Sequence, residues 1–245
     1  MNEIVIGKNA VLEILKSKRK INKIYFEESS KGSPFYLEIL KKIKKDIEIE
    51  HLTPKEMEKK AGTNKHQKIA AEVEPFKYQN LSYIFNKNSE GKSILVLLDG
   101  ISDPRNFGAI LRVCEAAGVD GVIIRKKRSV RVTSTVYKTS SGAVNSIPII
   151  QVSNLSQSIR ILKKEGYWVI GADLKGETAY FEYDYDKKTV LVLGSEGKGI
   201  STLLLKMCDV LVSIPMAGKV SSLNVSVACG VILYEMIRRR QKKEY

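Results

Sequence analysis

The sequence predicts an α/β protein in which a parallel sheet carries helices on both faces, preceded by a smaller α/β unit. The first observation is a regular pattern from Ser93 onward, where near-continuous runs of Val, Ile and Leu alternate with amphipathic stretches. Strands that are buried on both faces of a parallel sheet have this character. The second is the polar stretch 77–92, which separates this pattern from an N-terminal segment of mixed strands and helices. We therefore expect a domain over residues 1–76, a linker over residues 77–92 and a domain over residues 93–245.

In the N-terminal domain, helix-start signals are the clearest guide. Ser33 as N-cap with Pro34 at the first helical position predicts one helix, and Thr53 with the following proline predicts another. Strand-like runs and helical spacing of apolar residues give the remaining elements. The expected helices cover residues 8–18, 33–45 and 53–62, and the expected strands cover residues 22–28, 47–52 and 68–75.

In the C-terminal domain, the apolar runs predict strands and the amphipathic stretches predict helices. The expected strands cover residues 94–99, 119–124, 147–152, 167–173, 189–194 and 210–215. The expected helices cover residues 107–118, 154–166 and 199–208, followed by a last helix that ends in "RRRQKK". Open α/β sheets bind ligands outside the carboxyl ends of their strands. Three such ends carry unusual residues, at 99–112, 194–199 and 214–224, and together they predict a composite site.

The composition is that of an ordinary globular protein with a large positive charge. Hydrophobic residues make up 43% of the 245 residues and charged residues 28%, which argues against disorder. The net charge of +14 suggests a polyanionic partner, most simply a nucleic acid, although a solvated lysine-rich surface gives the same excess. No apolar run approaches the ~20 residues of a membrane span, and the first residues lack a signal-peptide pattern. We expect a cytoplasmic protein.

Several common chemistries are disfavoured by the loops themselves. A P-loop needs a glycine five residues before its Gly-Lys pair, but Val192 and Ser213 occupy these positions before Gly197 and Gly218. The glycines of "GSEGKG" lack the spacing of a dinucleotide fingerprint, and the C-terminal domain has no histidine to serve a nucleophilic serine. The three cysteines are far apart in apolar contexts, which predicts reduced core thiols and no metal site.

The strand-end loops combine glycines, neutral amides and hydroxyls, one carboxylate and arginines. Close backbone approach with neutral amides suits a flat, neutral or cationic ligand such as an adenosyl group, whereas arginine suits phosphate. Transfer of a group from an adenosyl cofactor to a nucleic acid fits both features, because the amides would bind the cofactor and the arginines the phosphates. The candidate residues are Asn106, Ser222 and Asn224 among the neutral groups, Glu196 as the carboxylate, and Arg105 and Arg112.

Three segments resemble, in order and spacing, motifs 1, 2 and 3 of the SpoU (TrmH-type) RNA ribose 2′-O-methyltransferases of the SPOUT class. They are "DPRNFGAILR" (103–112), "LGSEGKGIS" (193–201) and "IPMAGKVSSLNVSVACGVILYE" (214–235). Near the start, "IGKNAVLEIL" and "HQKIAAEVEPF" resemble the small ribosomal-protein-like (L30e-like) RNA-binding domain fused to many members. Two residues depart from that pattern: Asn9 stands where relatives often have histidine, and Lys68 stands where glycine is common.

The resemblance implies a catalytic domain with a C-terminal trefoil knot that binds S-adenosyl-L-methionine, and an obligate homodimer. It implies methylation of a ribose 2′-hydroxyl, of a guanosine in 23S rRNA, by direct transfer without a metal. The same reaction on tRNA, or on an antibiotic-target nucleotide of rRNA, is an alternative. A catalytically silent RNA-binding protein of ribosome assembly is another.

The resemblance also assigns roles. The catalytic residues would be Asn106, Arg112, Glu196, Ser222 and Asn224. The cofactor-binding residues would be Gly194, Gly197, Ile214, Met216 and Leu223. Arg112 would hold the ribose or its phosphate and not act as base, because a guanidinium is always protonated.

Two local expectations accompany these roles. The basic run 125–131, with Arg105, predicts RNA contacts through Arg105, Arg125, Arg128 and Arg131. Asn106 is expected to be the N-cap of its helix, and Ser222 is a candidate cap of the last helix.

Overall fold

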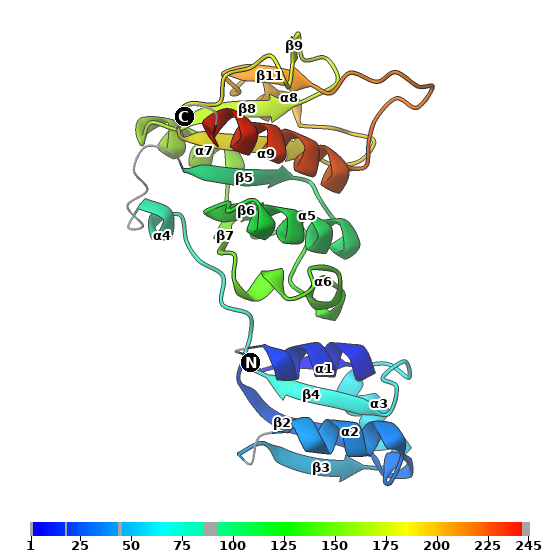
Figure 1. Cartoon of the computed structure of the whole chain (residues 1–245). Helices are drawn as coiled ribbons and strands as arrows, with labels where there is room; N and C mark the ends of the chain where they lie inside the picture. Colours follow the sequence, from blue (N-terminus) through cyan, green and yellow to red (C-terminus); the bar gives the residue numbers. More distant parts are fainter. Residues whose placement is uncertain (1, 18, 44–45, 86–92, 242–245) are drawn as a thin grey trace. The chain divides into compact units, whose positions relative to one another are not determined.

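The computed structural model describes residues 2–17, 19–43, 46–85 and 93–241, and it divides into two compact units. Unit 1 comprises residues 1–77 together with residues 132–145, and unit 2 comprises residues 78–131 and 146–245. Each unit contains one sheet with helices packed on it (Figure 1). The expected α/β class with a parallel sheet is confirmed.

Unit 1 is a four-stranded mixed sheet in the order β1-β4-β2-β3. β4 runs antiparallel to both of its neighbours, whereas β2 and β3 are parallel. Its elements are β1 (Glu3–Ile6), α1 (Lys8–Lys16), β2 (Ile21–Glu27), α2 (Pro34–Lys42), β3 (Glu48–Leu52), α3 (Pro54–Ala61), β4 (Ile69–Val73) and α6 (Ser134–Thr139). The capping expectations are confirmed: Ser33 caps α2, and Thr53 forms a reciprocal capping box with Glu56 at α3.

The sequence departure at Lys68 falls on an unusual backbone conformation. Lys68 has φ +65° and Gln67 has φ +53°, both in the left-handed region that glycine adopts at least cost. Side-chain contacts stabilise this turn: Gln67 Oε1 accepts from Lys8 N at 2.9 Å at the start of α1, and Lys68 Nζ pairs with Glu27 at 3.5 Å. The lysine therefore occupies a position whose backbone geometry favours glycine.

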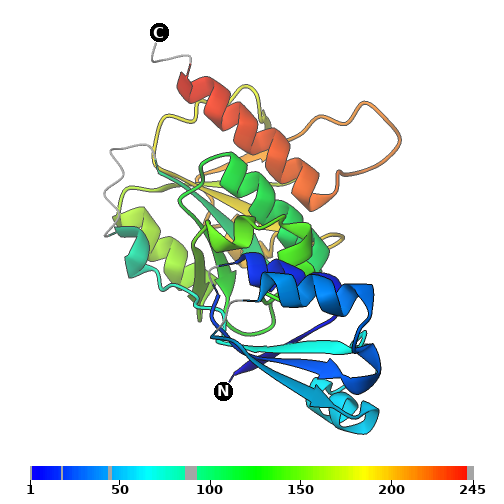
Figure 2. The ribbon, with the colours of Figure 1, turned by 60° about the horizontal axis from the view of Figure 1, so that its bottom comes forward.

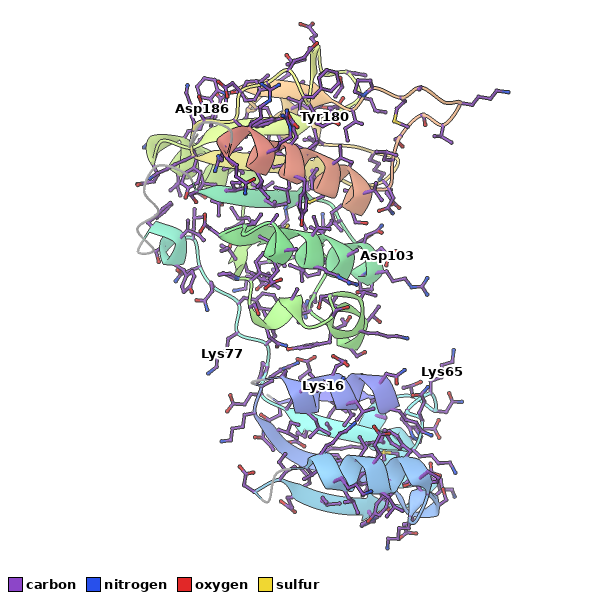
Figure 3. The ribbon with its side chains drawn as sticks, viewed as in Figure 1. Lys16, Lys65, Lys77, Asp103, Tyr180 and Asp186 are labelled. Atoms are coloured by element: carbon purple, nitrogen blue, oxygen red, sulfur yellow. The ribbon has the colours of Figure 1, made fainter. Side chains whose placement is uncertain are left out.

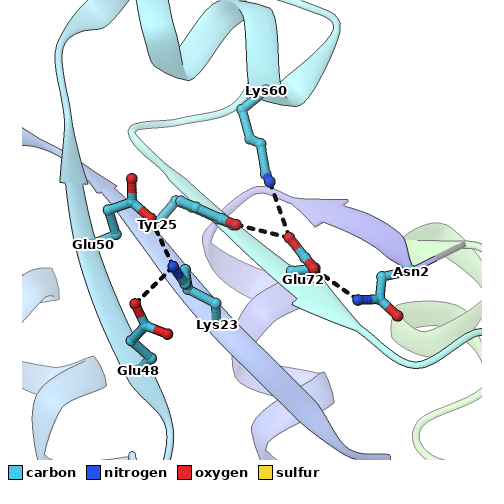
Figure 4. Close-up of polar contacts among 7 residues, drawn as sticks. All are labelled: Asn2, Lys23, Tyr25, Glu48, Glu50, Lys60 and Glu72. Atoms are coloured by element: carbon cyan, nitrogen blue, oxygen red, sulfur yellow. Dashed lines mark hydrogen bonds and ion pairs between the residues drawn. The ribbon is translucent and has the colours of Figure 1, made fainter.

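A polar network crosses the strands of unit 1 (Figure 4). Glu72 on β4 accepts from Asn2 Nδ2 at 2.7 Å, Tyr25 Oη at 2.7 Å and Lys60 Nζ at 2.9 Å. These bonds, of which the one from Asn2 has the largest effect, lower the pKa of Glu72 to about 2. Tyr25 itself is buried, so this carboxylate satisfies the hydroxyl of a core side chain.

Unit 2 is a seven-stranded sheet in the order β7-β6-β5-β10-β8-β11-β9, with every neighbouring pair parallel. Its strands are β5 (Ile94–Asp99), β6 (Gly121–Arg125), β7 (Ile149–Val152), β8 (Trp168–Ala172), β9 (Thr178–Ala179), β10 (Thr189–Gly194) and β11 (Val210–Ser213). Its helices are α4 (Ser82–Phe85), α5 (Pro104–Ala116), α7 (Leu155–Lys164), α8 (Thr202–Leu205) and α9 (Val225–Gln241). All six residues of the central strand β5 are buried, as expected for a strand covered on both faces.

Helices cover both faces of this sheet. Figures 1 and 2 both show α5 and α9 side by side on one face. On the other face, α4, α7 and α8 contribute Ile84, Ile159 and Leu204 to a continuous apolar core with the strands. Part of the stretch expected as a linker belongs to this unit, because Gln79 forms a parallel bridge with Ile150 of β7.

Some expected elements differ in extent from those observed. The helix expected over residues 199–208 is only the short α8, and the helix expected from residue 107 begins earlier, at Pro104, because Asp103 caps it. Strand β1 and helix α6 were not expected. Neither is amphipathic enough in sequence to stand out, and both depend on packing against elements distant in the chain.

Two arginines near the end of α9 bind carbonyl groups of the aromatic segment 180–187, of which Tyr180 and Asp186 are labelled in Figure 3. Arg240 donates to the carbonyl oxygens of Tyr185 at 2.9 Å and Lys187 at 2.6 Å, and Arg239 donates to Phe181. Bonds from Arg238, and then Arg239, lower the pKa of Glu235 to about 2. Arg239 and Arg240 of "RRRQKK" therefore anchor the helix end, whereas Arg238 bonds Glu235 within the helix. Lys242 and Lys243 lie outside the described residues.

Replacing Glu72 tests the network of unit 1. Because the folded-state pKa of Glu72 lies below its ordinary value, its stabilisation is present above pH 4.5 and is lost as the pH falls toward 2. Glu72→Gln should lower the melting temperature by about 5 °C at pH 7, and the difference should shrink between pH 4.5 and 2. Scanning calorimetry at several pH values measures this. Glu48→Gln, at an ion pair whose carboxylate is largely exposed, is the control and should change little. A deficit for Glu72→Gln that does not depend on pH would contradict the assignment.

Candidate active site

Three loops meet at the edge of the larger sheet where its parallel strands end. They follow β5, β10 and β11, and the loop between β11 and α9 projects beyond the strand ends (Figure 1). β5 and β10 pair in register up to Asp99 and Gly194, so these two loops start from neighbouring positions. Asp99 is buried, and its Oδ2 accepts from Ser201 N at 2.8 Å, which ties the loop after β10 to the end of β5.

Three of the expected catalytic residues, one from each loop region, form a hydrogen-bonded cluster. Asn106 Nδ2, in the first turn of α5, donates to Glu196 Oε1 at 3.0 Å. Asn224 Nδ2, directly before α9, donates to the same oxygen at 2.6 Å and to Asn106 Oδ1 at 3.0 Å. Two amide donors on one carboxylate oxygen leave Glu196 Oε2 without a hydrogen bond to any described residue. The exposed Glu196 can therefore accept a further donor from a ligand.

The loop that carries Glu196 is a tight turn built from glycines. Ser195 and Gly199 exchange backbone hydrogen bonds at 3.2 and 2.8 Å, and Gly197 and Gly199 have φ of +82° and +65°. A Cβ atom on Gly194 would overlap the backbone of Gly199 and Ile200. Gly194 is thus required by the packing of the turn on itself, and this packing places Glu196 toward Asn106 and Asn224.

The loop over residues 214–224 presents a surface suited to a flat, partly apolar ligand. The side chains of Ile214, Met216 and Leu223 are only half-buried. Within the described chain, residues 214–223 make no backbone–backbone hydrogen bond, so their N–H and C=O groups are available to a ligand. Apolar side chains beside unpaired backbone groups fit an adenosyl group, whose ring is apolar on its faces and polar at its edge.

The remaining expected catalytic residues are not part of the cluster. Arg112 lies on α5, six residues after Asn106, which is about 9 Å further along the axis and on a different face of the helix. Its side chain is exposed and makes no hydrogen bond or ion pair to a described residue. Ser222 is likewise exposed, with no hydrogen bond to the rest of the described chain.

Both capping expectations at this site were wrong. Asp103 caps α5 by accepting from Arg105 N at 2.8 Å, and Asn106 lies inside the first turn. Asn224, not Ser222, caps α9, because its Oδ1 accepts from Ser226 N at 2.9 Å. The signal for Asp103 was present in the sequence, since Asp followed by Pro is a strong helix start. Ser226, which bonds to this cap, was not among the residues selected from the sequence, because the residues next to it in the chain carry no distinguishing signal.

The basic run lies close to the loop that follows β5. Val130 N donates to Ile101 O at 3.1 Å, so the run and this loop are adjacent. Arg125, Arg128 and Arg131 are exposed, and Arg128 has φ +55°. Arg105 is also exposed, at the start of α5. These four arginines are therefore free to bind a polyanion near the strand ends.

The described residues contain no group of three or more His, Cys, Asp or Glu side chains that could hold a metal ion. The cysteines are free thiols; Cys114 and Cys229 are buried. Burial raises the pKa of the Cys208 thiol to about 12. In the described chain, no helix combines the length and apolar character needed to cross a membrane.

Comparison with known proteins identifies the family. Residues 93–234 match the model of the SpoU rRNA Methylase family, and residues 4–79 match a model for RNA 2′-O ribose methyltransferase substrate binding. A relative from Staphylococcus haemolyticus named "Putative TrmH family tRNA/rRNA methyltransferase" is 40% identical, over 98% of this chain and 96% of its own. The chain therefore belongs to the SpoU (TrmH) family of RNA methyltransferases.

Solved structures share the fold. The SpoU methyltransferase AviRb from Streptomyces viridochromogenes, in complex with the cofactor AdoMet, matches with a TM-score of 0.75 at 26% identity, covering 98% of this chain and 91% of AviRb. An AdoMet-bound rRNA methyltransferase from Sinorhizobium meliloti matches with a TM-score of 0.71 at 25% identity, covering 97% of this chain and 87% of its own.

The glycine turn gives a prediction. Gly194→Ala should destabilise unit 2 by about 2 kcal/mol or more, because the added methyl group meets backbone atoms that cannot move aside. Urea unfolding followed by the fluorescence of Trp168, the single tryptophan, which lies in β8 beside β10, measures this. Gly218→Ala is the matched control, since a Cβ there meets nothing within 4 Å. Equal unfolding midpoints for the two variants would show that the turn tolerates a side chain.

Proposed function

We propose that this protein transfers a methyl group from S-adenosyl-L-methionine to the ribose 2′-hydroxyl of one nucleotide, a guanosine, in 23S rRNA. The observation that carries the proposal is the cluster of Asn106, Glu196 and Asn224, which unites one residue from each of the three family motifs. The proposed target follows the sequence resemblance, which includes RlmB, a bacterial enzyme that methylates a guanosine of 23S rRNA. The substrate-binding match over residues 4–79 supports the ribose 2′-hydroxyl as the target.

The cofactor would be held by Gly194, Gly197, Ile214, Met216 and Leu223. The apolar side chains of the loop after β11 would contact the adenine ring, and the unpaired backbone groups of the same loop would bind its polar edge. S-adenosyl-L-methionine supplies an electrophilic methyl group that a hydroxyl oxygen can accept directly. The loop needs no carboxylate to hold it, because aimed backbone dipoles suffice for a ligand with a delocalised ring.

The protein would contribute to the reaction by positioning the ribose hydroxyl and the neighbouring phosphate. Glu196 Oε2 is available to accept the hydrogen bond of the ribose hydroxyl, while Oε1 is held by the two amides. Arg112 would neutralise the neighbouring phosphate and fix the nucleotide, and Ser222 would contact the reacting ribose. The hydroxyl proton leaves to a phosphate oxygen or water, since a guanidinium cannot accept it.

RNA recognition would be shared between the two domains. We assign residues 1–76 to an L30e-like substrate-binding domain and residues 93–245 to the catalytic domain. Of the connecting stretch 77–92, the part around Gln79 and α4 packs on the catalytic domain. Arg105, Arg125, Arg128 and Arg131 would bind the phosphate backbone beside the site, which the bond between Val130 and Ile101 supports. The net charge of +14 favours such a partner, and the cytoplasm is where rRNA would be met.

We also propose the C-terminal trefoil knot and a homodimer. Family membership supports both. The sheet order, in which β10 enters between β5 and β8 while β11 lies beyond β8, supports the knot. For the homodimer, α9 carries the exposed apolar residues Val227 and Tyr234, 50% and 54% exposed, seven residues apart and thus on one helix face.

Methyl labelling tests the function and its alternatives. The protein is incubated with S-adenosyl-L-methionine carrying a labelled methyl group and with total RNA from a strain that lacks the gene, and the labelled nucleotide is mapped. We expect label on a guanosine 2′-oxygen of 23S rRNA. Label in tRNA would favour the alternative function, a tRNA 2′-O-methyltransferase. The "tRNA/rRNA" name of the S. haemolyticus relative is consistent with this alternative. No label, together with no cofactor binding at millimolar concentration, would indicate a silent RNA-binding protein.

Arg112→Ala tests the role of the exposed arginine. Methyl transfer should fall at least ~100-fold, because the nucleotide is no longer held, whereas S-adenosyl-L-methionine binding by calorimetry should be unchanged. Arg160→Ala, which removes an exposed arginine of α7 in the same unit, is the control and should retain full activity. Wild-type activity in Arg112→Ala would remove this residue from the site.

A further inference from the structure

Ser226, at the second position of α9, makes two hydrogen bonds to the amide of Asn224. Its Oγ donates to Asn224 Oδ1 at 2.6 Å, and its backbone N–H donates to the same oxygen at 2.9 Å. The N–H is one of the donors that the first turn of a helix leaves without an intrahelical partner. Asn224 thus caps α9 with its oxygen, and Ser226 holds that oxygen from two directions.

The backbone N–H of Ser226 decides which way the Asn224 amide points. A backbone N–H can only donate, so the amide atom that faces it must be the oxygen. The Asn224 nitrogen then lies on the other side, where it donates to Glu196 and to the oxygen of Asn106. That second bond requires Asn106 to present its oxygen, which leaves the Asn106 nitrogen to donate to Glu196. The backbone N–H at position 226 therefore sets the orientation of two amides, and the Ser226 hydroxyl adds a second bond to the same oxygen.

The alternative orientation would disrupt the cluster. If the Asn224 amide rotated by 180°, its oxygen would face Glu196 Oε1, and two acceptors would be in contact without a proton between them. Glu196 would also lose the shorter of its two donors, at 2.6 Å. Glu196 and Asn224 are exposed, so water competes for each of these bonds and the amide needs a second restraint.

We propose that Ser226 is a positioning residue for methyl transfer. Its hydroxyl keeps the Asn224 nitrogen directed at Glu196, and thereby holds the carboxylate in the position that meets the ribose hydroxyl. This inference rests on the proposed function, in which Glu196 and Asn224 act at the transfer site. Ser226 touches neither the cofactor nor the RNA in this account; it acts through Asn224.

A second helix of the chain provides an internal control for ordinary capping. At the start of α7, Ser156 Oγ donates to Asn154 Oδ1 at 2.7 Å, and Gln157 N donates to the same oxygen at 3.2 Å. Asn154 is the N-cap there, as Asn224 is at α9. The nitrogen of Asn154, however, donates to no described residue. The two caps share their chemistry, but only the one at α9 continues into a cluster.

Paired variants test the proposal. Ser226→Ala should lower kcat for methyl transfer about 10- to 100-fold with little change in the KM for S-adenosyl-L-methionine. Ser226→Thr, which keeps the hydroxyl, should restore most of the activity. Ser156→Ala removes the matching cap bond at α7 and should leave kcat unchanged. If Ser226→Ala and Ser156→Ala lower the melting temperature alike and both keep wild-type kcat, Ser226 is only a cap and the proposal is wrong.

A spectroscopic measurement separates this inference from the proposed function. The side-chain amide protons of Asn224, assigned in nitrogen-15 spectra by comparison with Asn224→Asp, should exchange slowly with water in the wild-type protein and faster in Ser226→Ala. Ser226→Thr should resemble the wild type. Equal exchange in the wild type and Ser226→Ala would overturn the positioning role. If the wild-type protein methylates no RNA, the proposed function fails, whereas the exchange result still decides whether Ser226 orients Asn224.

Discussion

The site depends on one constraint, which is that β5, β10 and β11 run parallel and end at the same edge of the sheet. Neighbouring strands lie about 4.8 Å apart, so loops that follow them start close together however far apart they are in the chain. β5 and β10 are adjacent, and Asp99 at the end of β5 bonds the loop after β10 at Ser201. The scaffold is apolar and buried, while the polar groups are confined to the loops it presents.

The cluster combines a single carboxylate with neutral amides in a protein of net charge +14. Phosphates of an approaching RNA are repelled by a carboxylate, so a site with several acidic groups would oppose the binding that the arginines favour. Asn106 and Asn224 hold Glu196 without adding charge of either sign. The negative charge is thereby limited to one group, whose second oxygen remains for the substrate hydroxyl. The exposed arginines nearby supply the attraction for the phosphates.

Much of the secondary structure follows from the sequence because its signals are local. Pro34 and Thr53 mark helix starts, and the continuous apolar run from Ile94 to Leu98 marks a buried strand. The sheet order was not predictable, because the position of β10 between β5 and β8 depends on contacts between distant segments. The grouping of residues 132–145 with unit 1 is non-local for the same reason. Asn106, Glu196 and Asn224 were selected by motif resemblance, and the bonds between them required the structure.

An Asn-x-Ser sequence occurs at three helix starts, as Asn80-Leu-Ser, Asn154-Leu-Ser and Asn224-Val-Ser. In each, the serine hydroxyl donates to the asparagine oxygen, at 2.6 to 2.7 Å. Sequence alone can therefore predict the cap but cannot distinguish one cap from another. Asn224 differs from the other two because its nitrogen faces the carboxylate of Glu196, which the glycine turn after β10 places there. A cap that orients the oxygen of an amide necessarily orients its nitrogen as well. The two bonds from Ser226 to the Asn224 oxygen therefore cap the start of α9 and also direct the Asn224 nitrogen at Glu196.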